Sequence, residues 1–251
     1  MPELHPATRG FGAAAAAYER GRPDYPAAAV RRLVARLDLR PGRTVLDLAA
    51  GTGKLTRLLV PSGANVLAVE PVPQMRAELE KRVRGIAALG GTAERIPLLD
   101  AYVDAVTVGQ AFHWFRPESA LPEIARVLRP AGGLALVWNT REERDPLQAA
   151  ISAILAPLEG DTPRRGHRDW RAVLDGSGLF TPCETALFGH RQILDEDGLA
   201  ERVLSISFVA AASRAARAGV EERVRALARD VGTPVELPYV TELYLAFRPV
   251  S

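Results

Sequence analysis

Two carboxylates and a glycine-rich turn are the features of this chain best suited to chemistry. Asp47 lies in an apolar strand that leads into a turn containing Gly51 and Gly53, and a second apolar strand ends at Glu70. Glycines let a backbone come close to a ligand, and a helix that follows the turn offers free N–H groups. A carboxylate at the end of the second strand can accept hydrogen bonds from both hydroxyls of a ribose. The spacing therefore predicts a pocket for a nucleoside with a charged tail.

Strands and helices alternate around these residues. Apolar runs predict strands at 43–48, 65–70, 86–90, 103–108 and 134–138. Apolar residues at helical spacing predict helices that begin near 27, 53, 72 and 117. The proline and glycines at 129–133 predict a turn. Such alternation is typical of a parallel sheet covered by helices on both faces. After the fifth strand we expect two helices within 141–179, a strand at 181–193, helices within 195–232 and a closing strand at 235–248.

We interpret the chain as one α/β domain. Its core would comprise about 27–140 together with the two late strands, which add to the sheet edge in antiparallel fashion. The segments at about 141–178 and 195–232 would form a helical cap over the carboxyl ends of the strands, where ligands bind in sheets of this kind.

Composition narrows the function classes. The 251 residues are 47% apolar and 25% charged, which predicts a packed core. With 32 basic and 30 acidic residues the net charge is +2, so nothing in the charge favours a nucleic-acid or membrane partner. Cys183 is the only cysteine and the start of the chain lacks a signal pattern, so we expect a cytoplasmic protein. His167, His190 and Cys183 lack the spacing of metal ligands, so no metal is expected.

Other nucleotide pockets fit the turn less well. A phosphate-binding P-loop would require glycine at 48 and serine or threonine at 55, and both positions hold leucine. A dinucleotide fingerprint would require a third glycine where Thr56 stands, and it leaves the negative charge of Asp47 beside a pyrophosphate. A carboxylate there suits a cationic ligand better.

Five segments in order resemble the class I S-adenosylmethionine-dependent methyltransferases, in the small-molecule group with the type 11 domain. These segments are 47–53, Glu70, 91–97, 103–106 and 124–133, and the resemblance covers about 11–140. It implies a Rossmann-like, doubly wound, seven-stranded sheet of order 3-2-1-4-5-7-6 with the last strand antiparallel. It also implies S-adenosylmethionine as cofactor, S-adenosylhomocysteine as product and a small-molecule acceptor.

The resemblance also implies site residues. Glu70 would hold the ribose, and Arg22 would hold the carboxylate of the cofactor. Tyr18 would close over the sulfonium. The other residues expected at the cofactor are Asp47, Ala49, Gly51, Thr52, Gly53, Pro71, Met75, Thr92, Ala93, Glu94, Gln110 and Ala111. Ala49 replaces the first glycine of the family pattern, and we expect an ordinary backbone angle there.

His113 and Trp114, after the fourth strand, are the candidate catalytic residues. His113 would serve as a base for a neutral acceptor, or it is a core histidine. Trp114 would donate its indole N–H to an acceptor oxygen, or it only packs. A carboxylate acceptor would require no base, only donors such as Gln110 or Trp114. Asp104, at the start of the fourth strand, is expected to be structural.

Two other functions stay open at this point. A non-catalytic S-adenosylmethionine binder would use the same pocket, and a dinucleotide oxidoreductase would use the same fold. Methylation of RNA is disfavoured because the chain has no basic arm.

Overall fold

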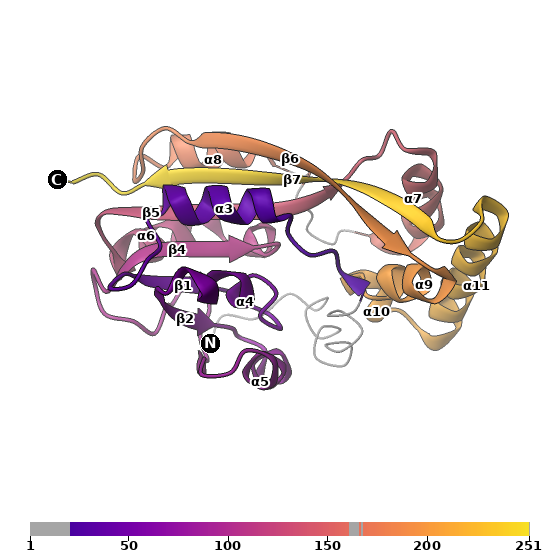
Figure 1. Cartoon of the computed structure of the whole chain (residues 1–251), viewed down its shortest axis with the longest axis horizontal. Helices are drawn as coiled ribbons and strands as arrows, with labels where there is room; N and C mark the ends of the chain where they lie inside the picture. The colour runs from indigo at the N-terminus through magenta and orange to yellow at the C-terminus, as the bar shows by residue number, and fades with distance from the viewer. Residues whose placement is uncertain (1–20, 161–165, 167, 251) are drawn as a thin grey trace. The chain divides into compact units, whose positions relative to one another are not determined.

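The structure is a computed structural model, and it describes residues 21–160, 166 and 168–250. The chain forms two compact units (Figure 1). Over the described residues, the sheet unit comprises 25–138, 166, 168–188 and 241–250, and the helical unit comprises 21–24, 139–160 and 189–240. Tyr18 lies outside the described residues. The expectation of one domain stays a prediction.

One seven-stranded sheet organises the fold. Its strands are β1 (Thr44–Leu48), β2 (Asn65–Val69), β3 (Ala88–Leu89), β4 (Val103–Gly109), β5 (Leu128–Arg141), β6 (Glu184–Leu194) and β7 (Val235–Phe247). Their order is β3-β2-β1-β4-β5-β7-β6, as expected. The first five pair in parallel, and the arrow of β7 runs opposite to that of β4 (Figure 1). In agreement, the Arg248 amide, just after β7, donates to the Gly132 carbonyl near the beginning of β5 at 2.8 Å.

The helices divide between the two units. The sheet unit has α3 (Ala27–Arg36), α4 (Thr56–Leu59), the 3-10 turn η2 (Val60–Ser62), α5 (Pro73–Arg82), the 3-10 turn η3 (Phe112–Trp114), α6 (Pro117–Val127) and α8 (Trp170–Gly176). The helical unit has α7 (Pro146–Glu159), α9 (Glu196–Leu204), α10 (Ser207–Ala210) and α11 (Arg214–Val231).

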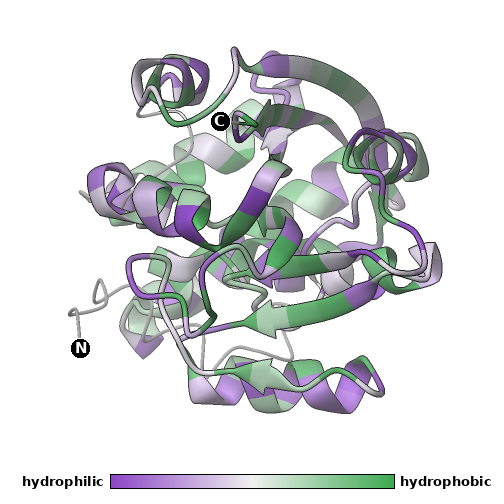
Figure 2. Cartoon of the chain, turned by 90° about the vertical axis from the view of Figure 1, so that its left-hand side faces the viewer, coloured by the Kyte–Doolittle hydropathy of each residue, from purple (hydrophilic) through white to green (hydrophobic). Residues whose placement is uncertain are grey.

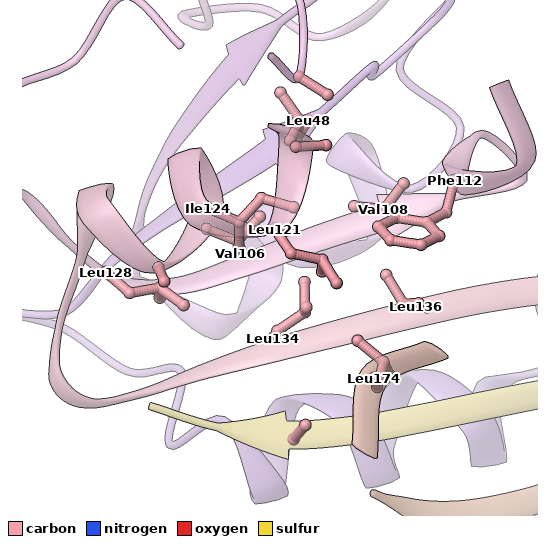
Figure 3. Packing of buried hydrophobic residues seen from close by; sticks show 14 of the residues in the cluster. Leu48, Val106, Val108, Phe112, Leu121, Ile124, Leu128, Leu134, Leu136 and Leu174 are labelled. Atoms are coloured by element: carbon pink, nitrogen blue, oxygen red, sulfur yellow. The ribbon is translucent and has the colours of Figure 1, made fainter. Parts of the chain in front are cut away.

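Alternation along the central strands builds a core on each face of the sheet. Leu46, Val106 and Leu134 pack with α6 and α8, and Figure 3 shows Val106 and Leu134 near Leu121 of α6. Their neighbours Val45 and Ala105 pack with α3 and α4. Successive side chains of a strand point to opposite faces, so strands that are apolar throughout must be buried on both. In Figure 2 these central strands are coloured mostly as hydrophobic, while the helices carry both colours.

The helical unit has a core of its own. Apolar residues of α7, α9, α10 and α11 pack with the first part of β7, where Val235, Leu237 and Tyr239 alternate with more exposed residues. An amphipathic helix gains most of its stability from such burial.

Two expectations about the elements were wrong in detail. The helix predicted from 53 begins at Thr56. The turn predicted at 129–133 lies within β5, where the pairing register with β4 shifts and Ala131 has a positive φ of 61°. Trp170 and Leu174 of α8 are buried in the core of the sheet unit, and the expected cap stays a prediction.

Candidate functional site

The carboxylate of Glu70 is bound to the glycine-rich turn. It is only 5% exposed. One oxygen accepts from the Gly51 amide and the other from the Val72 amide, both at 2.9 Å. Burial raises the pKa of Glu70 to about 7, although these two amides and the charge of Arg76 partly offset the effect. Each carboxylate oxygen retains a lone pair, so the group can accept two further hydrogen bonds.

The two glycines of the turn have different roles. Both have positive φ, 59° at Gly51 and 86° at Gly53. A Cβ at Gly53 would lie 2.9 Å from Val83 and 3.0 Å from Leu79, so this glycine lets the turn pack on α5. A Cβ at Gly51 would meet no atom of the described residues within 4 Å. Among these residues, the backbone at Gly51 therefore leaves space that a ligand can occupy.

The expectation for Ala49 was wrong. Its φ is 56°, in the left-handed region, rather than an ordinary angle. This region costs an alanine about 1 kcal/mol because its Cβ crowds the backbone. The turn keeps its left-handed geometry even where the family glycine is replaced, because the pairing of Ala50 with β2 and the closure at Gly53 hold it on both sides.

Asp47 is fully buried on the face of the sheet that packs with α3 and α4. Its oxygens accept from the hydroxyls of Thr56, at 2.6 Å, and Thr107, at 3.0 Å. Burial raises the pKa of Asp47 to about 6 against these two hydrogen bonds. The carboxylate thus connects the end of β1 to β4 and to the start of α4. Thr52, between the two glycines of the turn, is also buried.

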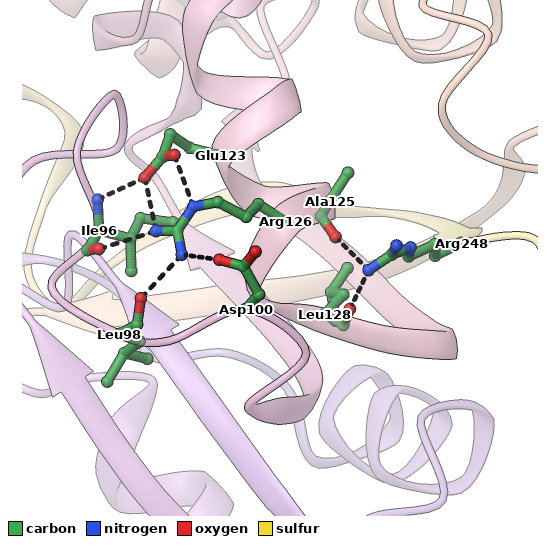
Figure 4. A network of polar contacts seen from close by, with 8 residues as sticks. All are labelled: Ile96, Leu98, Asp100, Glu123, Ala125, Arg126, Leu128 and Arg248. Carbon is green, nitrogen blue, oxygen red and sulfur yellow. Dashed lines mark hydrogen bonds and ion pairs between the residues drawn. The ribbon is translucent and has the colours of Figure 1, made fainter.

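The segment after β3 is fixed by a polar network (Figure 4). The Ile96 amide donates to Glu123 at 3.0 Å, and the Arg126 guanidinium donates to the carbonyls of Ile96 and Leu98 and to Asp100. Hydrogen bonds to Glu123 and Asp100 hold the pKa of Arg126 above its ordinary value. The network anchors this segment to α6.

This anchored segment carries the predicted adenine-side residues. Thr92 and Ala93 are buried, and the Glu94 carboxylate accepts from the Arg116 amide at 3.1 Å. The Thr92 hydroxyl is buried with no hydrogen-bond partner in the structure as described. A buried hydroxyl in that state is suited to a ligand. Across the same edge of the sheet, Pro71 follows Glu70 and Met75 is buried in α5.

The end of β4 turns sharply into η3. Gln110 has a φ of 59°, and its backbone N–H donates to the Val137 carbonyl of β5 at 2.8 Å. Non-glycine residues in this region cluster at functional sites. Ala111 follows, half-buried against the core.

His113 and Trp114 lie in η3, half-buried, with ring centroids 5.2 Å apart. The indole of Trp138 donates to Nδ1 of His113 at 3.3 Å. Trp138 is itself stacked on Trp170 and buried. Sequence reasoning missed Trp138 because it reads as one more apolar residue of β5. The available signal was the residue type, because tryptophan is the only large apolar side chain whose N–H can donate a hydrogen bond to a neighbouring group.

Two further groups singled out in the sequence have contacts of their own. Asp104 begins β4 and accepts from the Thr44 amide, Arg43 and Arg129, at 2.8 to 2.9 Å. Burial opposes ionisation, but the Thr44 amide and the two guanidiniums hold the pKa of Asp104 below its usual range. Its expected structural role is confirmed. Arg22 belongs to the helical unit, where its Nη2 donates to the Ser205 carbonyl at 3.4 Å, and its role at the cofactor stays a prediction.

Comparison with known proteins identifies the family. Residues 46–136 match the family model described as a methyltransferase domain. An uncharacterized methyltransferase of Mycobacterium tuberculosis is 42% identical over 238 residues, which is 92% of each chain. The chain belongs to the class I S-adenosylmethionine-dependent methyltransferases.

Further comparisons agree with this assignment. A demethylmenaquinone methyltransferase of Beutenbergia cavernae is 35% identical to this chain over 171 residues. The match covers 62% of this chain and 71% of that relative. A solved structure of the phosphoethanolamine N-methyltransferase 2 of Haemonchus contortus, in complex with S-adenosylhomocysteine, has the same fold. Its TM-score is 0.58 at 14% identity, over 95% of this chain and 57% of that one.

The family settles the alternatives that the sequence left open. The protein is an enzyme that uses S-adenosylmethionine, rather than a dinucleotide oxidoreductase or a non-catalytic binder. Within the residues that the structure describes, no helix has the length and apolar character needed to span a membrane.

Proposed function

We propose that this methyltransferase transfers the methyl group to an oxygen of a small-molecule acceptor, a carboxylate or a hydroxyl. The observation that supports an oxygen acceptor best is the hydrogen bond from Trp138 to Nδ1 of His113. A neutral imidazole whose Nδ1 accepts carries its proton on Nε2. In this tautomer the Nε2–H of His113 would donate a hydrogen bond to the acceptor oxygen.

The cofactor residues form part of the same proposal. Glu70 would accept from the ribose hydroxyls with its remaining lone pairs, and the open side of Gly51 would admit the methionine part. The Thr92 hydroxyl, with Ala93 and Glu94, would line the adenine side. Asp47, Thr52, Gly53, Pro71 and Met75 would hold the turn and its surroundings in place, and Gln110 and Ala111 would flank the sulfonium.

The chemistry requires little beyond orientation. When bound, S-adenosylmethionine supplies a methyl group on a positively charged sulfur that a nucleophile displaces in line. The protein has to hold the acceptor oxygen at the attack distance and exclude water. A carboxylate is already ionised at neutral pH, so Nε2–H of His113 and the indole of Trp114 would only orient it. A base role for His113 would require Nδ1 to leave the Trp138 indole.

A product screen with labelled methyl donor tests the acceptor. We expect methylated oxygen from a panel of carboxylic acids, phenols, alcohols, amines and quinones. His113→Ala should lower kcat/KM by about 10- to 1,000-fold, the range for loss of one positioned donor. His113→Gln restores an N–H donor but supplies no base, and it should recover most of the lost activity.

The controls separate orientation from base catalysis. Trp138→Phe keeps the ring on Trp170 but removes the indole N–H, so Nδ1 becomes free to take a proton. If His113→Gln is as inactive as His113→Ala while Trp138→Phe is more active, His113 is a base instead. Methylation of nitrogen or carbon alone would overturn the oxygen acceptor.

We further propose that the enzyme acts in the cytoplasm on free small molecules rather than on nucleic acid. The near balance of 32 basic and 30 acidic residues supports this, because sequence-independent nucleic-acid binding depends on basic patches. Binding of labelled RNA at physiological salt would contradict it.

A further inference from the structure

Within the described part of the chain, a buried arginine of the helical unit has no carboxylate partner. Arg202, on α9, is 6% exposed. Its Nε donates to the Tyr239 hydroxyl at 2.9 Å, and its guanidinium lies 5.7 Å from the centre of the Tyr239 ring. Its Nη1 is buried with no hydrogen-bond partner in the described structure. Among described residues, Arg202 makes no ion pair.

Nearby arginines of the same unit differ in this respect. Arg225 and Arg229 of α11 pair with Asp197 and Glu196 at the start of α9, each at 2.7 Å. The acids at the start of α9 are thus occupied by α11. The guanidinium of Arg202 is left with a neutral hydroxyl and a ring face.

Such an arrangement is costly in the unliganded protein. A charge that is taken out of water without a counter-charge loses hydration that one neutral hydrogen bond does not replace. An anion bound at Nη1 would supply the missing counter-charge and hydrogen bonds. Arginine is well suited to this, because its planar fork matches the two oxygens of a carboxylate or phosphate.

Polar groups of β6 and of the backbone at Gly21 lie near Arg202. The backbone at Gly21 lies so close to α9 that a Cβ there would be 2.8 Å from the Cα of Arg202. Gln192 of β6 donates to the Gly21 carbonyl at 3.0 Å, and its Oε1 is buried without a partner among described residues. His190, two residues earlier on β6, stacks on Tyr239 at 5.6 Å. A donor and an acceptor without partners thus lie in one small region.

We propose that the helical unit holds an anion-binding site centred on Arg202, which takes the carboxylate or phosphate group of a small organic molecule. The guanidinium binds the anion through Nη1, and the Tyr239 hydroxyl orients the guanidinium from Nε. The Oε1 of Gln192 accepts from a hydroxyl or amide of the same molecule. Because Arg202 is buried, the anion enters after a local movement of side chains.

The test uses the full chain and three probes: citrate, succinate and inorganic phosphate, each at constant ionic strength. Wild type should bind at least one of them, measured by calorimetry and by a rise in Tm. Arg202→Met should weaken this binding at least tenfold. In chloride alone, Arg202→Met should unfold at the same or a higher Tm, because the variant lacks an uncompensated buried charge. Arg229→Met, which removes an exposed and ion-paired arginine, should bind as wild type does.

Two further variants keep the proposal falsifiable if Arg202→Met does not fold. Tyr239→Phe keeps the ring and removes the hydroxyl, and Gln192→Leu removes the second contact. Each should weaken binding several-fold. The proposal is overturned if wild type binds none of the three probes, or if these variants and Arg202→Met bind them as wild type does.

Kinetics separate the two possible sources of the anion. If it belongs to the acceptor, the bound probe competes with the acceptor, and Arg202→Met raises KM for acidic acceptors but not for their amides. If it is a separate effector, inhibition or activation is non-competitive. Calorimetry with S-adenosylhomocysteine on Arg202→Met, expected to match wild type, keeps a failure of this site distinct from a failure of the cofactor site.

Discussion

At the residue scale, the Glu70 carboxylate is buried and accepts a hydrogen bond from a backbone amide at each oxygen. Two amides hold its oxygens, yet its pKa is raised to about 7 because removal from water outweighs them. In the unliganded protein, stability from this group is fully present below its ordinary pKa of 4.5 and is lost as the pH rises through 7. A ligand that donates to the carboxylate favours its charged form and so releases a proton on binding.

Cofactor affinity should therefore depend on Glu70 and on pH. Between about pH 5 and 7, the Kd for S-adenosylhomocysteine should fall by up to about tenfold per pH unit. Glu70→Gln should bind more weakly and lose this dependence. Calorimetry across this range, in two buffers of different ionisation enthalpy, measures both affinity and proton release. An unchanged pH profile in Glu70→Gln would assign the titration to Asp47, whose pKa is about 6.

At the element scale, the turn after β1 depends on what surrounds it. Ala49 has a left-handed backbone conformation. Two backbone hydrogen bonds next to it hold this conformation: the Ala50 amide donates to the Val69 carbonyl, and the Gly53 amide donates to the Ala50 carbonyl. The sequence pattern located this turn correctly because glycines and a carboxylate after an apolar strand are strong local signals. It did not predict the angle at Ala49, because that angle is imposed by pairing with β2, which is distant in sequence.

Ala49→Gly should stabilise the protein. Glycine removes the left-handed penalty of about 1 kcal/mol but adds freedom to the unfolded chain, so we expect a net gain of roughly 0.5 kcal/mol. Chemical denaturation should show a higher midpoint with an unchanged slope. Ala50→Gly is the matched control: Ala50 is not among the positive-φ residues, so glycine there should destabilise. Equal effects at both positions would contradict the argument.

At the scale of the whole molecule, three large, separate hydrophobic clusters among the described residues support the fold. One lies on each face of the sheet, and the third joins α7, α9, α10 and α11 to part of β7. The cofactor residues expected from the sequence lie in the sheet unit, apart from Arg22 in the helical unit and Tyr18 outside the described residues. Ligand binding should thus stabilise the sheet unit directly.

S-adenosylhomocysteine should raise the free energy of unfolding with the logarithm of its concentration once that concentration exceeds Kd. At a concentration of about 100 times Kd the gain is about 2.7 kcal/mol, because a ligand that binds only the folded state stabilises it by mass action. Hydrogen exchange should show added protection in β1, β2 and the turn between β1 and α4. NAD at the same concentration is the control. Stabilisation by NAD alone would contradict the assigned cofactor.

The sequence alone determined the alternation of strands and helices, the strand order through its family resemblance, and the cofactor. The alternation follows from local patterns, because apolar periodicity and glycine turns report on nearby backbone, whereas the strand order and the cofactor follow from the resemblance to the family. Only the tertiary structure decided that Gly53 packs on α5, that Asp47 accepts from Thr107, that Trp138 donates to Nδ1 of His113, and that Arg202 is buried with no counter-charge among the described residues. Each of these depends on side chains that are far apart in the chain and meet only when the strands and helices pack.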